Sequence, residues 1–208
     1  MSESKSVFLF GYSGHAFVII ESLIDAGFMV KGYFDLKPAE DNPYCLKYLG
    51  YENETDIKSV VGDDFVFPSI GDNMVRKKVI TLFEKYQLRQ FVAVDPSAKV
   101  SRTAVINPST YIGKSVIVNA QAKIGKGVIL NSGCIIEHEC KLSDYVHIAP
   151  GAVLCGNVSV GKDSFVGASS VVRQSINIGE KITVGAGSVV ISDIKESGIW
   201  VGNKLRKL

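Results

Sequence analysis

The chain contains three histidines, and one of them stands beside a carboxylate in a pattern suited to proton transfer. His138 and Glu139 lie in the sequence IEHEC at positions 136–140. A neighbouring carboxylate can hold an imidazole in one tautomer and raise its basicity, so this pair is a candidate general base. A catalytic zinc site is disfavoured, because it needs three protein ligands and the second half of the chain offers only His138 and His147 as histidines.

A repeat of six residues positions this pair. Seventeen aliphatic residues recur without a slip from Val94 to Val190, and the residue four places after each is small or apolar. A helix repeats every ~3.6 residues and a strand every 2, so a period of six predicts a chain that turns a corner every six residues. Three sides make a coil of 18 residues, and about six coils at ~4.8 Å give a prism roughly 27 Å tall. The prediction for residues 94–195 is a parallel β-helix.

The repeat also predicts where side chains point. Ile136 and Cys140 occupy inward positions, so His138 between them should face outward. Gly156 follows His138 by 18 residues and should lie one coil above it, leaving room for a ligand and offering an N–H to a developing oxyanion. His147 should lie on the adjacent side, where packing against a neighbouring subunit is an alternative role.

Small residues in the repeat have mainly structural explanations. Cys134 and Cys140 should be interior residues and not reactive thiols. Glycines such as Gly125 and Gly161 follow inward aliphatic residues, and we expect them to adopt the positive φ of tight corners.

The first 93 residues alternate between predicted strands and helices. Strands are expected at 6–10, 29–34, 65–70 and 91–94, with helices ending near Gly27 and running from Asp72 to about Gln87. Pro68 weakens the third strand. The pattern predicts a Rossmann-like α/β domain at 1–93 that binds ligands at the carboxyl ends of its strands, a β-helix domain at 94–195 and a C-terminal tail at 196–208.

A glycine turn follows the first predicted strand. Gly11 and Gly14 supply two of the three glycines of the GxGxxG fingerprint, and Ser13 and His15 add side-chain donors. An ordinary tight turn is the alternative. Asp35, at the end of the second strand, suits ribose hydroxyls, and Lys37 suits a phosphate or an acidic sugar. Too little chain remains for a nicotinamide half-site, so an attached mononucleotide fits better than NAD.

Composition excludes several classes of protein. Of 208 residues, 23 are basic and 21 acidic, giving a net charge of +2, which does not direct the chain to nucleic acid or an anionic membrane. The chain is 46% hydrophobic, enough for a sizeable core. Its apolar runs fall short of the ~18 residues that span a bilayer, and it begins without a signal-peptide pattern, so we expect a soluble cytoplasmic protein.

Several motifs together resemble the NeuD/PglD family of bacterial sugar acyltransferases. They are the glycine turn at 11–15, IGDN at 70–73 with RKK at 76–78, Asn131, IEHEC at 136–140, and the segment from His147 to CGNV at 155–158. The resemblance implies a left-handed β-helix, a homotrimer with acetyl-CoA between neighbouring prisms, and no metal. IEHEC is most similar to the N-acetyltransferases that act on nucleotide-linked amino-sugars, typically 4-amino sugars, in glycan biosynthesis.

The resemblance also implies roles for individual residues. His138 would be the general base, Glu139 would increase its basicity, and Gly156 would donate to the oxyanion. Acetyl-CoA would contact His147, Ala168 and Ala186. The nucleotide-linked amino-sugar would be held by Ser13, Gly14, His15, Asp35, Leu36, Lys37 and Gly71. The family's closing Gly-x-Pro-Ala-Lys turn is replaced by VGNKL at 201–205, and Lys204, Arg206 and Lys207 would either meet the phosphates of CoA or remain solvated.

Other functions remain open at this point. An O-acetyltransferase acting on sialic acid or another sugar would use the same residues, and a non-catalytic scaffold would bind the nucleotide-sugar without turnover. A metal hydratase on the same prism lacks a third histidine, and a nucleotidyltransferase needs more than 93 residues before the repeat. For a transferase we expect direct attack without a covalent intermediate, because two of the three prism cysteines point inward.

Overall fold

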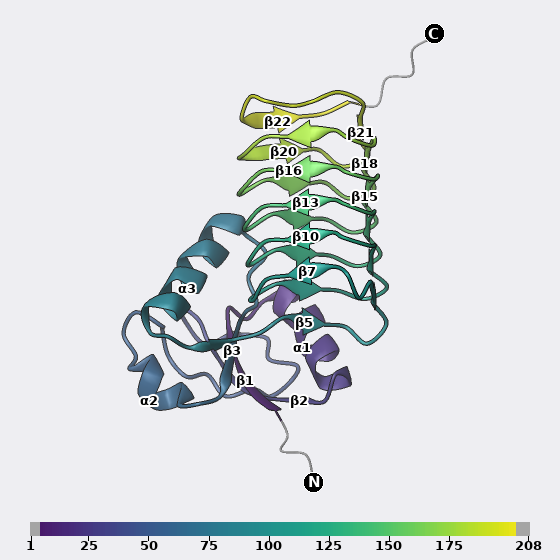
Figure 1. Ribbon diagram of the computed structural model, residues 1–208. Coiled ribbons are helices and arrows are strands. Elements are labelled where there is room, and N and C mark those ends of the chain that lie inside the picture. The colour runs from purple at the N-terminus through teal and green to yellow at the C-terminus, as the bar shows by residue number, and fades with distance from the viewer. Residues whose placement is uncertain (1–4, 203–208) are drawn as a thin grey trace.

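The computed structural model describes residues 5–202, which form an α/β region with a triangular column rising from it (Figure 1). The expected contacts of Lys204, Arg206 and Lys207 lie outside the described residues. No helix among the described residues is both long and apolar enough to cross a membrane.

The N-terminal region is built on a four-stranded parallel sheet of order β2-β1-β3-β4. Its strands are β1 (Lys5–Phe10), β2 (Phe28–Phe34), β3 (Phe65–Pro68) and β4 (Arg89–Gln90), and its helices are α1 (Gly14–Asp25), α2 (Ile57–Val61) and α3 (Asn73–Lys85). β2 and β3 lie on opposite sides of β1, so the carboxyl end of β1 is the switch point where such sheets bind ligands. Asp72 caps α3 as predicted, accepting from the N–H groups of Met74 and Val75 at 2.9 Å.

Two elements differ from the sequence expectations. Helix α2 was not expected; its signal is Asp56, whose side chain accepts from Ser59 N and caps the first turn. The strand expected at 91–94 divides into β4, which completes the N-terminal sheet, and β5 (Ala93–Val94), which belongs to the column.

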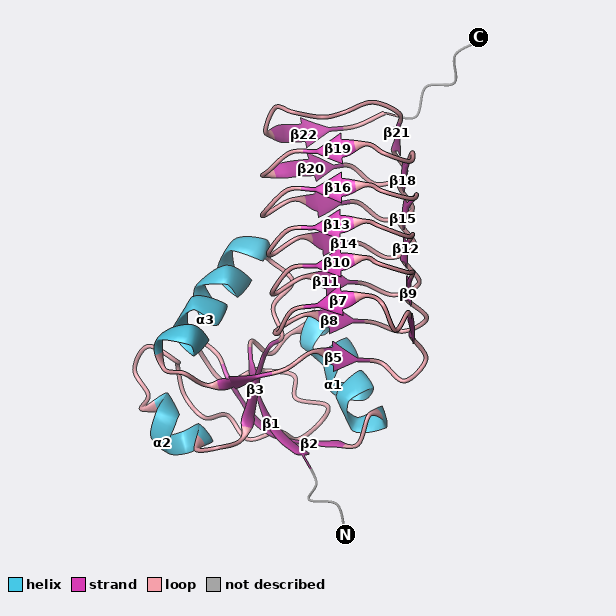
Figure 2. Ribbon diagram, viewed as in Figure 1, coloured by secondary structure: helices cyan, strands magenta, loops and turns pink. Residues whose placement is uncertain are grey.

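The column is a three-sided prism of short parallel strands (Figure 2). The first sheet contains β5, β8 (Tyr111–Ile112), β11 (Ile129–Leu130), β14 (His147–Ile148), β17 (Phe165–Val166), β20 (Ile182–Val184) and β22 (Gly198–Trp200). The second contains β6 (Lys99–Val100), β9 (Ile117–Val118), β12 (Ile135–Ile136), β15 (Val153–Leu154), β18 (Val171–Val172) and β21 (Val189–Val190). The third contains β7 (Val105–Ile106), β10 (Lys123–Ile124), β13 (Lys141–Leu142), β16 (Ser159–Val160) and β19 (Asn177–Ile178). Each strand pairs with the strand 18 residues on, as Ile129 does with His147, which confirms the predicted coil.

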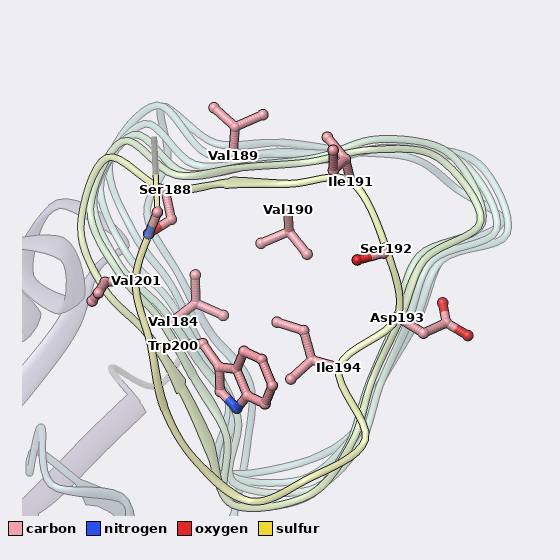
Figure 3. A pocket seen from close by; sticks show the side chains of 11 residues that line it. Val184, Ser188, Val189, Val190, Ile191, Ser192, Asp193, Ile194, Trp200 and Val201 are labelled. Carbon is pink, nitrogen blue, oxygen red and sulfur yellow. The ribbon is translucent and has the colours of Figure 1, made fainter. Parts of the chain in front are cut away.

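The aliphatic ladder fills the prism as predicted, except at its base. From Ile112 onward the inward residues are at most 7% exposed, whereas Val94 and Val100 are 36% exposed because no coil lies below them. At the other end, Figure 3 shows Val190 pointing inward and Val189, its neighbour on β21, pointing outward. The alternation of strand side chains thus gives each face an outward row of its own.

The corner glycines are present for a reason that the sequence analysis missed. Positive φ falls three residues after each inward aliphatic residue, for example at Glu139 and Tyr145, and not at the glycines directly after it. Those glycines lie against the coil above: a Cβ on Gly125 would be 2.6 Å from Asp144 N, and one on Gly161 2.5 Å from the carbonyl carbon of Gly179. Close stacking of coils, and not φ, excludes a side chain there.

Candidate functional site

The second sheet presents an outward row of aliphatic side chains, which we call the apolar face. Its members are Ile117, Ile135, Val153, Val171 and Val189, one per coil. Three of them are large exposed hydrophobics, with 37% of Ile117, 39% of Val171 and 49% of Val189 exposed. The candidate site residues of the prism lie along the two edges of this face.

The histidine edge is the corner that leads from the second sheet to the third. It carries His138 and Glu139 in the turn after β12, and Gly156 in the turn after β15 one coil above. The side chain of His138 is 59% exposed, so it faces outward as predicted. His138 Nδ1 lies 3.1 Å from Glu139 Oε2. The carboxylate accepts this hydrogen bond, so the proton resides on Nδ1 and the lone pair on Nε2 is left to act as a base.

The imidazole of His138 packs directly on Gly156. A Cβ at Gly156 would be 2.5 Å from His138 Cε1 and 2.6 Å from Nε2. The space that we expected a ligand to use is therefore filled by the catalytic candidate itself. The N–H of Gly156 makes no hydrogen bond to any residue in the 5–202 range, so it is free to donate.

Gly156→Ala should lower kcat ten- to a hundredfold, because a misplacement of about 1 Å can cost that much in an oriented site. The added methyl would displace the ring of His138 while leaving Glu139 intact. Gly202→Ala is a matched control, since a Cβ there meets nothing within 4 Å. Steady-state kinetics on both variants measure the effect, and equal kcat in the two would show that the ring position is unimportant.

The alanine edge is the opposite corner, leading from the first sheet to the second. It carries Ala168 in the turn before β18 and Ala186 in the turn before β21. Within the described part of the chain, the N–H groups of both alanines are without hydrogen-bond partners. Because the apolar face separates the two edges, a single chain does not bring Ala168 and Ala186 to His138.

His147 lies on the first sheet and faces the α/β region. Only 8% of it is exposed. Asn131 Nδ2 donates to His147 Nε2 at 3.3 Å, so the proton of this imidazole is on Nδ1. The ring packs against Phe165 at 4.9 Å and lies 6.2 Å from the ring of His15.

His15 does not point where the sequence analysis placed it. Its ring turns toward the prism and packs edge-on against Tyr111 at 5.9 Å, and its Nε2 is buried without a partner in the described structure. It lines none of the pocket formed by the glycine turn. The expectation of a side-chain donor to a phosphate is therefore wrong for His15, because α1 begins at Gly14 and carries the side chain of His15 into the junction.

Both junction histidines are held neutral. Burial, together with the charge of Arg76, lowers the pKa of His15 to about 4 and that of His147 to about 3. An unfolded histidine titrates near pH ~6.5, so the stability that these two rings contribute is complete above that value and is lost as the pH falls below it.

Lowering the pH from 7.5 to 5.5 should therefore cost about 2–3 kcal/mol of the free energy of unfolding. Urea denaturation at both pH values measures the loss. In the double variant His15→Gln/His147→Gln the loss should shrink by about that amount. The same pH dependence in both proteins would contradict the assignment.

The glycine turn and Asp35 form a second candidate region. Asp35 accepts from Tyr12 N at 2.8 Å and from Leu36 N at 2.7 Å, so its carboxylate holds the turn in addition to any ribose contact. Ser13, Asp35 and Lys37 line one pocket of about 330 Å³. Leu36 lines a separate pocket on the α3 side. Gly71 lies at the junction, where a Cβ would be 4.0 Å from His15 Cγ.

Arg76 joins the two regions, and the sequence analysis gave it no role of its own. Although charged, it is 1% exposed. It donates to the carbonyls of Ile70 and Gly71 and to Asn73 Oδ1 in the α/β region, and to the carbonyls of Gly127 and Tyr145 in the prism, at 2.7–3.2 Å. The substrate turn at Gly71 is thereby fixed against the prism. Its position three residues into a capped helix gave no sign of this burial.

Neither a thiol nor a metal is arranged for chemistry in the described residues. Cys134 and Cys140 are buried as predicted, and burial raises their pKa values to about 12 and about 11. Within residues 5–202, no three His, Cys, Asp or Glu side chains are grouped so that they could hold a metal ion.

Comparison with family models and solved structures agrees with this geometry. Residues 6–83 match the PglD N-terminal domain, and residues 157–192 match the hexapeptide repeat of succinyl-transferase. A variant of perosamine N-acetyltransferase from Caulobacter crescentus, in complex with CoA and GDP-perosamine, is 31% identical over 95% of this chain and 93% of that one, with a TM-score of 0.90. PerB from the same organism, in complex with the same two ligands, is 32% identical over 95% and 94%, also at 0.90.

A third structure supports the fold. The acetyltransferase domain of PglB from Neisseria gonorrhoeae, in complex with acetyl coenzyme A, has a TM-score of 0.90 over 99% of this chain and 100% of that one, at 24% identity. Together these matches confirm the predicted architecture of an α/β region followed by a left-handed β-helix of hexapeptide repeats.

Proposed function

Because the chain belongs to the NeuD/PglD-like family of sugar acetyltransferases and is an acetyl-CoA-dependent enzyme, we propose that it acetylates the amino group of a nucleotide-linked amino-sugar. The relatives crystallised with CoA and GDP-perosamine support this class of acceptor. The observation that carries the proposal is the outward imidazole of His138, held between the carboxylate of Glu139 and the main chain of Gly156.

The reaction is a direct transfer. The sugar amine attacks the thioester carbonyl, and His138 Nε2 takes the proton that the nitrogen loses. The N–H of Gly156 stabilises the oxyanion of the tetrahedral intermediate. When the C–S bond breaks, CoA leaves as a thiolate and receives the proton from His138. Glu139 stabilises the imidazolium in between, through its bond to Nδ1.

Acetyl-CoA fits the alanine edge. Ala168 and Ala186 leave the corner open, and their free N–H groups can donate to the amide carbonyls of the pantetheine arm. His147 is nearly buried and neutral, so its contact would be a hydrogen bond from an uncharged ring at the margin of the same side.

A homotrimer would complete this site. Three prisms that turn their apolar faces toward a threefold axis bury the aliphatic row and close with C₃ symmetry. The rotation brings the histidine edge of one protomer beside the alanine edge of the next. The base and the cofactor contacts, which one chain keeps apart, would then share a cleft.

The α/β region would hold the nucleotide. Ser13 and Gly14 lie at the amino end of α1, where N–H groups attract phosphates. Asp35 can accept from ribose through its remaining lone pairs, and Lys37 lines the same pocket. The four cysteines are free thiols, as expected of the reducing cytoplasm in which we place the protein.

The proposal is tested by incubating the protein with acetyl-CoA and UDP-, GDP-, dTDP- or CMP-linked amino-sugars. We expect thiol release together with the gain of one acetyl mass on the amine of one sugar. Acetyl gain on a hydroxyl would indicate an O-acetyltransferase. Nucleotide-sugar binding without turnover of any candidate would indicate a scaffold.

A further inference from the structure

A second pocket flanks Asp35 on the α3 side of the sheet. Its volume is about 240 Å³, and it opens where Leu36 follows Asp35. Apolar walls come from Leu36 and from Val75, Val79 and Leu82 of α3, and Tyr51 adds an aromatic ring. A flat, largely apolar cleft beside a ribose acceptor has the character of a site for a base.

Two charged side chains also line this pocket. Glu52 is half-buried, and burial, with a smaller contribution from the charge of Asp35, raises the pKa of its carboxyl. Lys78 projects from α3. Across residues 5–202 neither side chain forms an ion pair, so both have hydrogen-bonding capacity for a ligand.

We propose that this pocket binds the base of the nucleotide-linked substrate and selects guanine, an inference that rests on the proposed function. The carboxylate of Glu52 accepts from N1–H and the 2-amino group, and the ammonium group of Lys78 donates to O6. These are charge-assisted hydrogen bonds, and the pair with the carboxylate is bidentate.

The other bases do not present this edge. Uracil and thymine have a single N–H between two carbonyls, so one carboxylate oxygen would face a carbonyl oxygen. Adenine and cytosine present an acceptor ring nitrogen beside their amino group, which the carboxylate repels. Only guanine offers two adjacent donors and an acceptor in the order that Glu52 and Lys78 match.

Isothermal titration of the full chain with GDP, IDP, UDP, dTDP, CDP and ADP tests the inference. GDP should bind most tightly, and IDP, which lacks only the 2-amino group, at least about fivefold more weakly. Glu52→Gln should weaken GDP at least about tenfold and remove the difference between GDP and IDP. Glu54→Gln is the matched control, because Glu54 is exposed and lies outside the pocket.

Equal affinities for all six nucleotides, tighter binding of UDP or dTDP, failure of all six to bind, or an unchanged Glu52→Gln variant would each overturn the inference. Acetyl transfer without any preference for GDP would do so while leaving the transferase proposal intact. Selective GDP binding without acetyl transfer would support the pocket and contradict the transferase.

Discussion

His138→Ala should reduce kcat for acetyl transfer by about 10²–10⁴-fold, the range that a positioned general base contributes. The substitution leaves the turn and Glu139 in place but removes the atom that takes the proton of the amine. Affinity for acetyl-CoA should change little, because the alanine edge that would hold it belongs to a different corner of the prism. Steady-state kinetics and titration with acetyl-CoA measure the two quantities separately.

Lys162→Ala provides the comparison for this variant. Lys162 occupies the same place in its hexad as His138, two residues after an inward aliphatic residue, but at the corner between the third and first sheets. Its side chain is exposed, and kcat should not change when it is shortened. Full kcat in His138→Ala would exclude His138 as the base.

Arg76→Met should lower the free energy of unfolding by about 3–5 kcal/mol, which corresponds to removing one partner from a buried charged network. The guanidinium lies in the interior and serves five acceptors from the two regions. Burial lowers the pKa of Arg76 to about 9, so it remains charged at neutral pH. Methionine fills similar space but leaves all five oxygens without their donor.

Arg89→Met is the matched control for Arg76→Met. Arg89 is exposed and donates one bond, from Nη1 to the carbonyl of Asp63 at 2.8 Å. Its loss should cost less than about 1 kcal/mol. Arg76→Lys should fall between the two, because an ammonium group keeps the charge but cannot match the planar fork. Urea denaturation giving equal stabilities for Arg76→Met and Arg89→Met would show that Arg76 does not join the regions.

The prism and the direction of His138 could be predicted because both depend on local periodicity. Once Ile136 and Cys140 are assigned inward, alternation leaves His138 outside, and a coil of 18 residues places Gly156 above it. The contact of the imidazole with Gly156 was beyond this reasoning, since it depends on the rotamer of His138 and not on its register.

The junction could not be predicted in the same way. The direction of His15 depends on how α1 docks on the prism near Tyr111, and the burial of Arg76 depends on carbonyls 51 and 69 residues away at Gly127 and Tyr145. Such contacts leave no periodic trace in the sequence. A short helix such as α2 fails for a related reason, because five residues are too few to show a helical period.

Mixing two inactive variants tests the shared cleft most directly. His138→Ala removes the base, and Ala168→Trp blocks the alanine edge. If each site takes its base from one protomer and its cofactor edge from the next, equal mixing into trimers makes about one site in four intact. We predict that each variant alone is inactive, that sedimentation shows three chains, and that mixed trimers recover about a quarter of the unaltered activity. Mixed trimers that form without recovering activity would contradict a site built between protomers.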